Sequence, residues 1–440
     1  MHKLKKIFLA KGAERILLKK LSPNDNSKNQ VYLGGDFESL NIIPNKGVYV
    51  DKGRKGSKRD RFKADVSMFW VNSNGDLYKA PLAQLILYPK YPEVRMSGFL
   101  QGCDAAPSHT MASRNEGRLL FIGIRGDGSI ICHATNLENE LTAQIQRIRN
   151  LEKVGVFLEI PLPSKIPADT RSVLLDTLRH INQKGWINSV RLCADGSLTE
   201  CKSSNCGGYT LEAQLGIKPN GYSEPDFLGW EVKQHSVKYL NRPHSGGPIT
   251  LMTPEPTGGF YKDKGVESFL RKFGYKDRKG REDRINFGGA YKLGQAVDLT
   301  GMTLHMPGYD VVTGKITDAD GGLTLVSAEG EQAAIWHYAD IMKLWNRKHS
   351  KAVYVPSLCE TAPSRRYKFG NIVELGTGTD FLKFLNAVAK GKVYYDPGIK
   401  LEDASAIKAR TKRRSQFRIK PSELKSLYNQ FETVDTAIER

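Results

Sequence analysis

The sequence lacks the features that would place the protein in a membrane. No apolar run approaches the roughly 18–20 residues that a membrane-spanning helix needs. The first residues, MHKLKKIFLA, begin like a signal peptide, but Lys11, Glu14 and Arg15 interrupt any apolar stretch at once. We therefore expect a cytoplasmic protein with no membrane contact.

Cysteine is scarce, and no two cysteines form a Cys-x-x-Cys pair. Six cysteines in 440 residues do not make a disulfide framework. Cys193, Cys201 and Cys206 lie near one another, and a structural zinc is one interpretation of that group. Reduced free thiols are the interpretation that we prefer.

Acidic side chains are few relative to basic ones. The chain has 47 Asp and Glu against 66 Lys and Arg, which gives a net charge of +19 and a pI near 9.5. A surplus of this size favours a polyanionic partner, because each neutralised phosphate releases condensed counterions. Hydrophobic residues at 40% and charged residues at 26% are typical of a globular protein.

At 440 residues the chain is too long for one ordinary core, and the composition changes along it. Residues 1–160 predict a mainly β domain, because short apolar runs such as Val66–Val71 and Leu119–Ile124 alternate with Gly, Asn and Pro. Residues 161–168 hold three prolines and predict a linker. Residues 169–440 predict an α/β domain. In the first domain, the basic segment Asp51–Lys63 is either a solvated loop or a phosphate-contacting arm, and Asn139–Leu151 suits an amphipathic helix.

The second domain contains a stretch in which carboxylates and an ammonium converge. Trp230–Val237 predicts a strand, and side-chain alternation then directs Glu231, Lys233 and His235 to one face. Asp226 precedes this strand across a short turn and can fold back onto the same face. Carboxylate oxygens are the ligands that Mg²⁺ takes from proteins, so the stretch predicts a magnesium site.

The same residues carry a family resemblance. Asp226-x4-Glu231-x-Lys233 after a proline resembles the motif of the PD-(D/E)xK nucleases. The longer match, TLEAQLGI followed by PDFLGWEVK, resembles the MvaI/BcnI restriction endonuclease family, in the branch related to MutH. The resemblance implies an α/β, restriction-endonuclease-like mixed-sheet nuclease core behind the mainly β N-terminal domain.

The resemblance also implies a chemistry. Asp226, Glu231, Lys233 and Glu212 would be catalytic, with Asp226 and Glu231 as the ligands of Mg²⁺. The protein would be a monomeric type II restriction endonuclease that hydrolyses double-stranded DNA at a short CC-x-GG-like site and leaves a 5′-phosphate.

Basic and amide side chains in the second domain are candidates for DNA contact. Arg and Lys donate to guanine edges and phosphates, and Asn and Gln recognise adenine. Arg414, Gln416 and Arg418 would share one face if they lay on a strand, although a face that touches only phosphates is an equal alternative. The predicted DNA-binding residues are His235, Arg284, Asn286, Asp396, Lys400, Arg414, Gln416 and Arg418.

The N-terminal segment Leu18–Leu33, LKKLSPNDNSKNQVYL, resembles the effector-DNA-binding domain of EcoRII, a pseudobarrel. The resemblance implies that this domain binds a second DNA copy and stimulates cleavage. Two alternatives remain for the whole protein: a MutH-like strand-specific nicking endonuclease, and a non-catalytic sequence-specific DNA-binding protein. An RNA-binding module comes third, because the chain has no RNP-type aromatic signature.

Overall fold

The computed structural model describes residues 2–23, 29–53, 60–136, 151–162, 169–203, 205–217 and 226–438. The chain divides into two compact units, residues 1–168 with 315–319 and residues 169–314 with 320–440. The predicted helix 139–151 and the predicted linker 161–168 lie almost wholly outside the described residues. The middle of the basic segment 51–63 also lies outside them.

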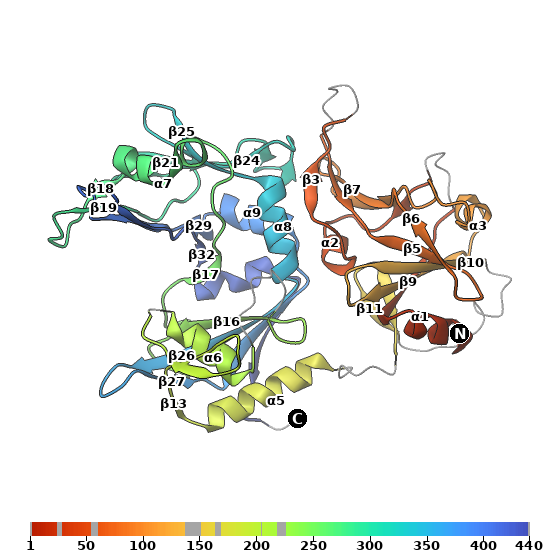
Figure 1. Ribbon diagram of the computed structural model, residues 1–440, viewed down its shortest axis with the longest axis horizontal. Coiled ribbons are helices and arrows are strands. Elements are labelled where there is room, and N and C mark those ends of the chain that lie inside the picture. Colours follow the sequence, from red (N-terminus) through yellow and green to blue (C-terminus); the bar gives the residue numbers. More distant parts are fainter. Residues whose placement is uncertain are drawn as a thin grey trace. The chain divides into compact units, whose positions relative to one another are not determined.

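The N-terminal unit is mainly β, as the sequence predicts (Figure 1). Its seven-stranded sheet has the order β11 (Glu152–Val154), β12 (Phe157–Ile160), β1 (Ala13–Lys20), β9 (Leu119–Arg125), β10 (Ile130–Thr135), β5 (Met68–Val71) and β6 (Leu77–Ala80). A five-stranded sheet has the order β2 (Val31–Tyr32), β8 (Glu93–Ser97), β7 (Gln84–Tyr88), β4 (Phe62–Asp65) and β3 (Val48–Val50). The helices of this unit are α1 (His2–Ala10), α2 (Ser39–Ile42) and α3 (Ser108–Ala112).

The core of the larger sheet follows the two-residue alternation of its strands. Ile16 and Leu18 of β1, Phe121 of β9 and Ile131 of β10 are all buried, and Phe8 of α1 packs against them. The helix therefore covers this face of the sheet with its apolar side, which is what an amphipathic helix of this composition does.

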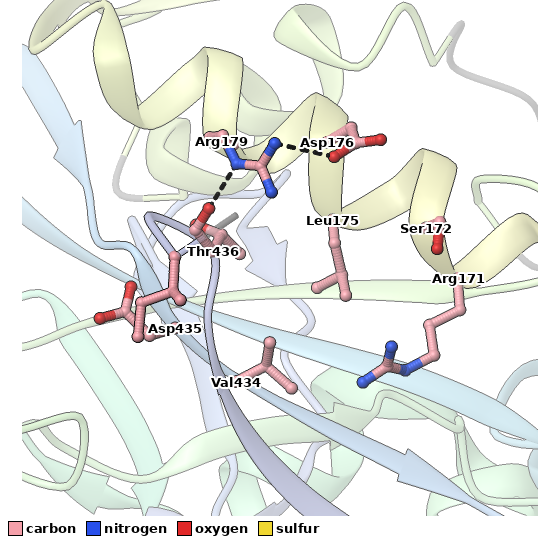
Figure 2. A pocket seen from close by; sticks show the side chains of 9 residues that line it. Arg171, Ser172, Leu175, Asp176, Arg179, Val434, Asp435 and Thr436 are labelled. Atoms are coloured by element: carbon pink, nitrogen blue, oxygen red, sulfur yellow. Dashed lines mark hydrogen bonds and ion pairs between the residues drawn. The ribbon is translucent and has the colours of Figure 1, made fainter. Parts of the chain in front are cut away.

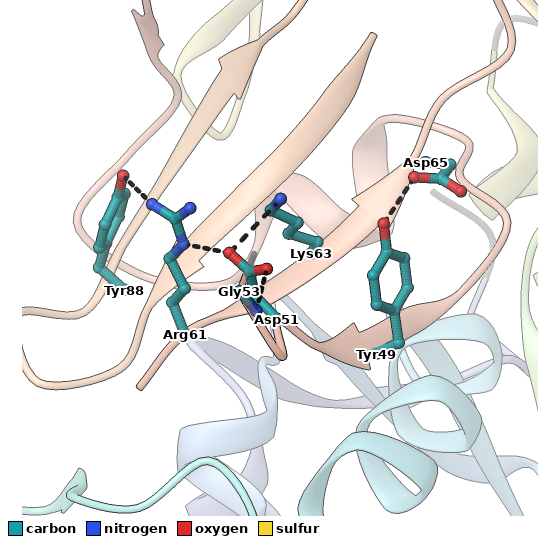
Figure 3. A network of polar contacts seen from close by, with 7 residues as sticks. All are labelled: Tyr49, Asp51, Gly53, Arg61, Lys63, Asp65 and Tyr88. Atoms are coloured by element: carbon teal, nitrogen blue, oxygen red, sulfur yellow. Dashed lines mark hydrogen bonds and ion pairs between the residues drawn. The ribbon is translucent and has the colours of Figure 1, made fainter. Parts of the chain in front are cut away.

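The two ends of the basic segment 51–63 meet across β3 and β4 (Figure 3). The Asp51 carboxylate accepts a hydrogen bond from Arg61 Nε at 2.6 Å and lies 3.4 Å from Lys63 Nζ. These contacts satisfy a buried carboxylate with two cations. Within the described part of the segment, Arg61 and Lys63 therefore stabilise the buried Asp51 carboxylate and with it the fold of the unit.

The second unit is built around a mixed six-stranded sheet. Its order is β13 (Trp186–Asn188), β27 (Arg366–Phe369), β26 (Lys351–Glu360), β28 (Ile372–Thr377) and β33 (Gln430–Asp435), and β16 (Glu231–Ser236) pairs with β26. The β16–β26 pairing is parallel, whereas β26 runs antiparallel to β27 and β28. This mixed sheet confirms the predicted α/β class of the second unit.

Smaller sheets accompany the central one. They contain, in order, β14 (Val190–Leu192) and β15 (Leu198–Glu200); β17 (Ile249–Met252), β32 (Phe417–Ile419) and β29 (Val393–Tyr395); β18 (Tyr275–Lys276), β19 (Arg284–Gly288), β30 (Gly398–Glu402) and β31 (Arg410–Lys412); and β20 (Ala296–Val297), β21 (Met302–His305), β24 (Gly322–Val326) and β25 (Gln332–His337). Two short strands, β22 (Tyr309–Asp310) and β23 (Lys315–Ile316), complete the set of described strands.

The helices of the second unit are α5 (Thr170–Gln183), α6 (Cys206–Gln214), α7 (Phe260–Phe273), α8 (Tyr338–Lys348), α9 (Phe381–Ala389) and the 3-10 helix η1 (Pro421–Leu427). Asp169 caps α5 by accepting the Ser172 N–H, and Asp380 caps α9 by accepting the Lys383 N–H. None of the helices within the described ranges is long and apolar enough to cross a membrane.

Helices α5 and α6 cover one face of the central sheet (Figure 1). Leu174 and Leu178 of α5 and Leu211 of α6 belong to one core with Val232 of β16 and Val353 of β26. Val232 faces this core, so its neighbours Glu231 and Lys233 point to the opposite face.

A cavity of about 350 Å³ opens beside α5 and the end of β33 (Figure 2). Arg179 crosses it, donating a hydrogen bond to the Thr436 carbonyl at 2.6 Å and pairing with Asp176 at 3.1 Å. The guanidinium thus ties the C-terminal strand to α5, and the cavity contains none of the predicted catalytic residues.

Candidate active site

Strand β16 holds two of the predicted catalytic residues on one face. Glu231 is 1% exposed and pairs in register with Ala352 of β26, while Lys233 pairs with Tyr354. Lys233 Nζ lies 2.6 Å from Glu231 Oε1. The strand predicted from the sequence is therefore present, and its alternation brings the carboxylate and the ammonium together.

A tight turn returns Asp226 to the start of β16. Phe227 and Trp230 exchange backbone hydrogen bonds at 2.9 and 2.8 Å, and the two residues between them have positive φ angles, 48° at Leu228 and 84° at Gly229. Positive φ at both central positions is the signature of a type I′ turn. The Asp226 carboxylate then accepts the Val232 N–H at 3.0 Å, which fixes it beside Glu231.

Helix α6 approaches β16 closely and carries Glu212. A Cβ on Gly207 would lie 2.6 Å from the side chain of Gln234, so the glycine permits the close contact. Burial, opposed by the charge of Lys233, raises the pKa of Glu212. Glu212 therefore belongs electrostatically to the same cluster as Lys233 and Glu231.

The carboxylates of this cluster are buried close to one another, and Lys233 balances their negative charge only in part. Burial, with repulsion from Glu231 as the second cause, raises the pKa of Asp226 to about 6. Burial also acts to raise the pKa of Glu231, but Lys233, His349 and Lys348 together outweigh it, and the pKa of that carboxyl is lowered. Burial likewise disfavours charge on Lys233, yet the adjacent carboxylates raise its pKa. The lysine is consequently an ammonium ion that holds Glu231 ionised, while Asp226 lacks a full counter-charge.

Two further residues of the cluster come from the end of α8 and were missed from the sequence. Lys348 and His349 both act electrostatically on Glu231, and Lys348 also acts on Asp226. His349 is fully buried and stacks on Trp345 at a centroid distance of 4.2 Å. Burial lowers the pKa of His349 to about 3, so the ring is neutral. No motif spacing links these residues to β16, because they are distant in the sequence and reach it through the fold.

The expectation that all cysteines are reduced is wrong. Cys201 and Cys206 form a disulfide that links the start of α6 to the residues before it. The interpretation as a zinc site with Cys193 is excluded for the same reason, since two of its three thiols are consumed. The sequence spacing of the two cysteines carries no recognised signal, and their approach depends on the turn that leads into the helix.

Two of the predicted DNA-binding residues, on β19, have protein partners. Arg284 lies 3.3 Å from Glu402, and its side chain is 11% exposed. Asn286 donates to Asp277 at 3.1 Å. Lys400 of β30 pairs in register with Asn286, and its burial lowers its pKa.

The C-terminal candidates do not form the shared strand face that was expected. Only Arg418 lies in β32, where it pairs with Asp396 at 2.7 Å and donates to the Pro248 carbonyl at 2.5 Å. Gln416 is buried and accepts a hydrogen bond from Thr250. Arg414 lies outside the strand and is exposed.

His235, the remaining candidate, is 5% exposed on β16. Its Nε2 lies 3.0 Å from the Pro243 carbonyl, and burial lowers its pKa to about 4. The ring is thus a neutral anchor for the following segment, and in this arrangement it is not open to DNA.

The cluster around Glu231 offers a cation two carboxylates. Asp226 uses one oxygen for the Val232 N–H, and Glu231 uses Oε1 for Lys233. Glu231 Oε2 is buried and has no hydrogen-bond partner among the described residues. In the part of the chain that the structure describes, no three His, Cys, Asp or Glu side chains are arranged to hold a metal ion.

The mixed sheet, with helices on one face and a carboxylate-bearing strand at its edge, places the second unit in the restriction-endonuclease-like class. The profile of the MvaI/BcnI restriction endonuclease family matches residues 175–428. That match covers more than half of the chain, and the protein belongs to this family.

Solved structures add similarities of lower identity. The complex titled "Restriction endonuclease MvaI-cognate DNA substrate complex" is 17% identical, covers 60% of this chain and 97% of its own, and has a TM-score of 0.44. The UbaLAI restriction endonuclease B3 domain with cognate DNA is also 17% identical, covers 37% of this chain and 98% of its own, and has a TM-score of 0.24. Among curated proteins, none matches this chain.

Proposed function

We propose that the protein is a Mg²⁺-dependent type II restriction endonuclease that hydrolyses phosphodiester bonds in double-stranded DNA at a short specific site. The observation that carries the proposal is the convergence of Asp226, Glu231 and Lys233 at the edge of the nuclease sheet. Membership of a restriction endonuclease family supports the reaction class.

The residues present fit a magnesium ion. Mg²⁺ is usually held by one or two carboxylates and keeps several waters, and Asp226 and Glu231 supply that number. The buried Glu231 Oε2 without a partner is an acceptor that a cation would satisfy. When bound there, the ion would polarise the phosphoryl group and make its bound water more acidic.

The proposed role of Lys233 follows from its charge. Its raised pKa keeps the ammonium protonated beside Glu231. In that state it stabilises the negative charge that develops on the oxygens around the pentacovalent phosphorus, and it orients the attacking water by donating a hydrogen bond to it. Glu212, with its raised pKa, lies on α6 as an additional acidic group for the same cluster.

The DNA partner is proposed on charge and family grounds. The net charge of +19 suits a duplex, and the family resemblance suggests a CC-x-GG-like target and a monomeric enzyme. For the N-terminal unit we propose an effector role, in which it binds a second DNA copy and stimulates cleavage.

The experiment that tests this function is cleavage of a plasmid with many short sites, in Mg²⁺ or in EDTA. Wild type should yield discrete fragments only with Mg²⁺, and Lys233→Ala should lose about a hundredfold to a thousandfold in rate. Sequencing the ends would identify the target. Cleavage that depends on Mg²⁺ but survives in Lys233→Ala would refute the assigned site, and equal cutting of both strands of unmethylated DNA would exclude a strand-specific nickase.

A further inference from the structure

The segment Val237–Gly247 joins β16 to β17 and follows directly on the strand of Glu231 and Lys233. It contains no acidic residue, and Lys238, Tyr239, Arg242 and His244 are all exposed. Arg242 lies over the ring of Tyr239 at 5.6 Å, which orients the guanidinium while its N–H groups stay available. The segment thus presents positive charge and hydrogen-bond donors beside the active site.

Internal hydrogen bonds hold the segment in one shape. The Ser245 hydroxyl accepts from the backbone N–H groups of Lys238 and Tyr239, each at 3.2 Å, and donates to the Arg242 carbonyl at 2.6 Å. The His235 ring on β16 contacts the Pro243 carbonyl through Nε2. Groups that are ordered before binding lose less entropy on contact with a partner, so this order favours a binding role.

His244 fastens the segment to the sheet through a buried carboxylate. Its Nε2 lies 2.7 Å from Glu374 Oε1, and the side chains are 48% and 2% exposed, respectively. Lys233, Tyr354 and Glu374 stand side by side on three neighbouring strands, so Glu374 shares the sheet face of Lys233 about 10 Å away. A buried carboxylate is costly, and here it holds a half-exposed histidine on the catalytic face.

The segment lies within reach of a DNA backbone that contacts Lys233. Along β16, His235 lies two residues beyond Lys233, which is about 7 Å. Each DNA strand carries one negative charge per about 3.4 Å of helix axis. A DNA backbone that ran along β16 from a phosphate at Lys233 would bring its next phosphates to the segment that His235 and His244 hold.

We propose that the segment Val237–Gly247 binds the DNA backbone next to the cleaved bond, with Lys238, Arg242 and His244 contacting phosphates and Glu374 positioning His244. The proposal rests on the proposed nuclease function and deepens it. The contact carries no base information, because it is made by exposed charged side chains to phosphates.

The first test is the salt dependence of DNA binding. The affinity of the full-length protein for a fluorescent duplex is measured in EDTA between 50 and 200 mM salt, for wild type and for Lys238→Gln/Arg242→Gln. Loss of two phosphate contacts should reduce the slope of log K against log salt by about 1.8 and weaken binding about tenfold per contact near 0.1 M. The control is Lys184→Gln/Lys202→Gln, two exposed cations next to α5 and α6, the helices that pack on the opposite face of the sheet, and its slope should change less. A segment variant with the slope of wild type overturns the proposal, as does a control that changes equally.

The second test addresses the anchor. Glu374→Gln keeps the shape of the side chain, and it should weaken binding several-fold while its melting curve stays cooperative. Combined with Arg242→Gln, its effect should be less than additive, because both act through one segment. Unchanged affinity in a folded Glu374→Gln variant would remove the positioning role. If wild type cuts DNA but the segment variants bind normally, only this proposal fails; if wild type neither cuts nor binds duplex, the proposed function fails with it.

Discussion

The predicted catalytic residues and the predicted DNA-binding arginines differ in how their charges are balanced within the protein. Around Glu231, like charges are buried together, Asp226 is left without a full counter-charge, and one carboxylate oxygen has no partner among the described residues. Around β19 and β32, by contrast, Arg284 and Arg418 each have a carboxylate partner within the protein. The first set thus keeps buried carboxylates whose charge is not fully balanced among the described residues, whereas the arginines of the second set are paired.

The difference has a physical meaning for function. Unresolved electrostatic conflict in a buried cluster is a common mark of a catalytic or metal-binding site. Paired residues must exchange a protein partner for DNA before they can bind it, and that exchange costs part of the interaction. An exposed cation without a carboxylate partner among the described residues, such as Arg414, binds DNA without that exchange.

The largest expected effect is on catalysis. Glu231→Gln removes the charge that would bind Mg²⁺ and hold Lys233, and plasmid cleavage should fall by at least about a thousandfold. A matched control is Glu267→Gln, an exposed residue of α7 whose loss should leave the rate within about twofold. Substantial cleavage by Glu231→Gln would show that the carboxylate cluster around Glu231 is not needed for catalysis, and the contrast with the paired arginines would then have no functional meaning.

A smaller effect is expected on stability at the same site. The pKa of Asp226 is raised to about 6, so between pH 3.8 and 6 the folded protein binds more protons than the unfolded chain. Raising the pH through that window therefore lowers the free energy of unfolding, by about 2 kcal/mol after allowance for partial exposure. Asp226→Asn should remove this loss and be more stable than wild type at pH 7.5, although inactive.

The measurement is urea unfolding of both proteins at pH 4 and pH 7.5 in EDTA. The stability advantage of the variant should be larger at the higher pH. An equal difference at both pH values would show that Asp226 is not strained in the folded state.

The smallest effect separates the two kinds of arginine. Arg418→Ala breaks the contacts to Asp396 and to the Pro248 carbonyl, and it should cost about 1–2 kcal/mol in the free energy of unfolding. Arg414→Ala removes an exposed side chain and should change stability by less than about 0.5 kcal/mol. For Arg414→Ala, the loss in the free energy of DNA binding, measured by fluorescence anisotropy, should exceed the loss in the free energy of unfolding. If Arg414→Ala lost more unfolding free energy than Arg418→Ala, the distinction between the exposed and the paired arginine would be contradicted.

Local features of the fold were predictable because short-range rules govern them. Strand β16, the turn at Gly229 and the cap at Asp169 each follow from a few adjacent residues. The condition for a shared face of Arg414, Gln416 and Arg418, a strand through all three residues, is not met, because β32 begins only at Phe417. Its start depends on pairing with β17 and β29, which the residues near it do not encode.

The sequence by itself determined the alternation that puts Glu231 and Lys233 on one face, the return of Asp226, and the basic character of the chain. Only the tertiary structure decided that Lys348 and His349 join that cluster, that Cys201 meets Cys206, and which arginines are already paired. The reason is the range of the interactions: alternation and turns act over a few residues, whereas burial and ion pairs depend on segments that are distant in the sequence and meet only in the folded protein.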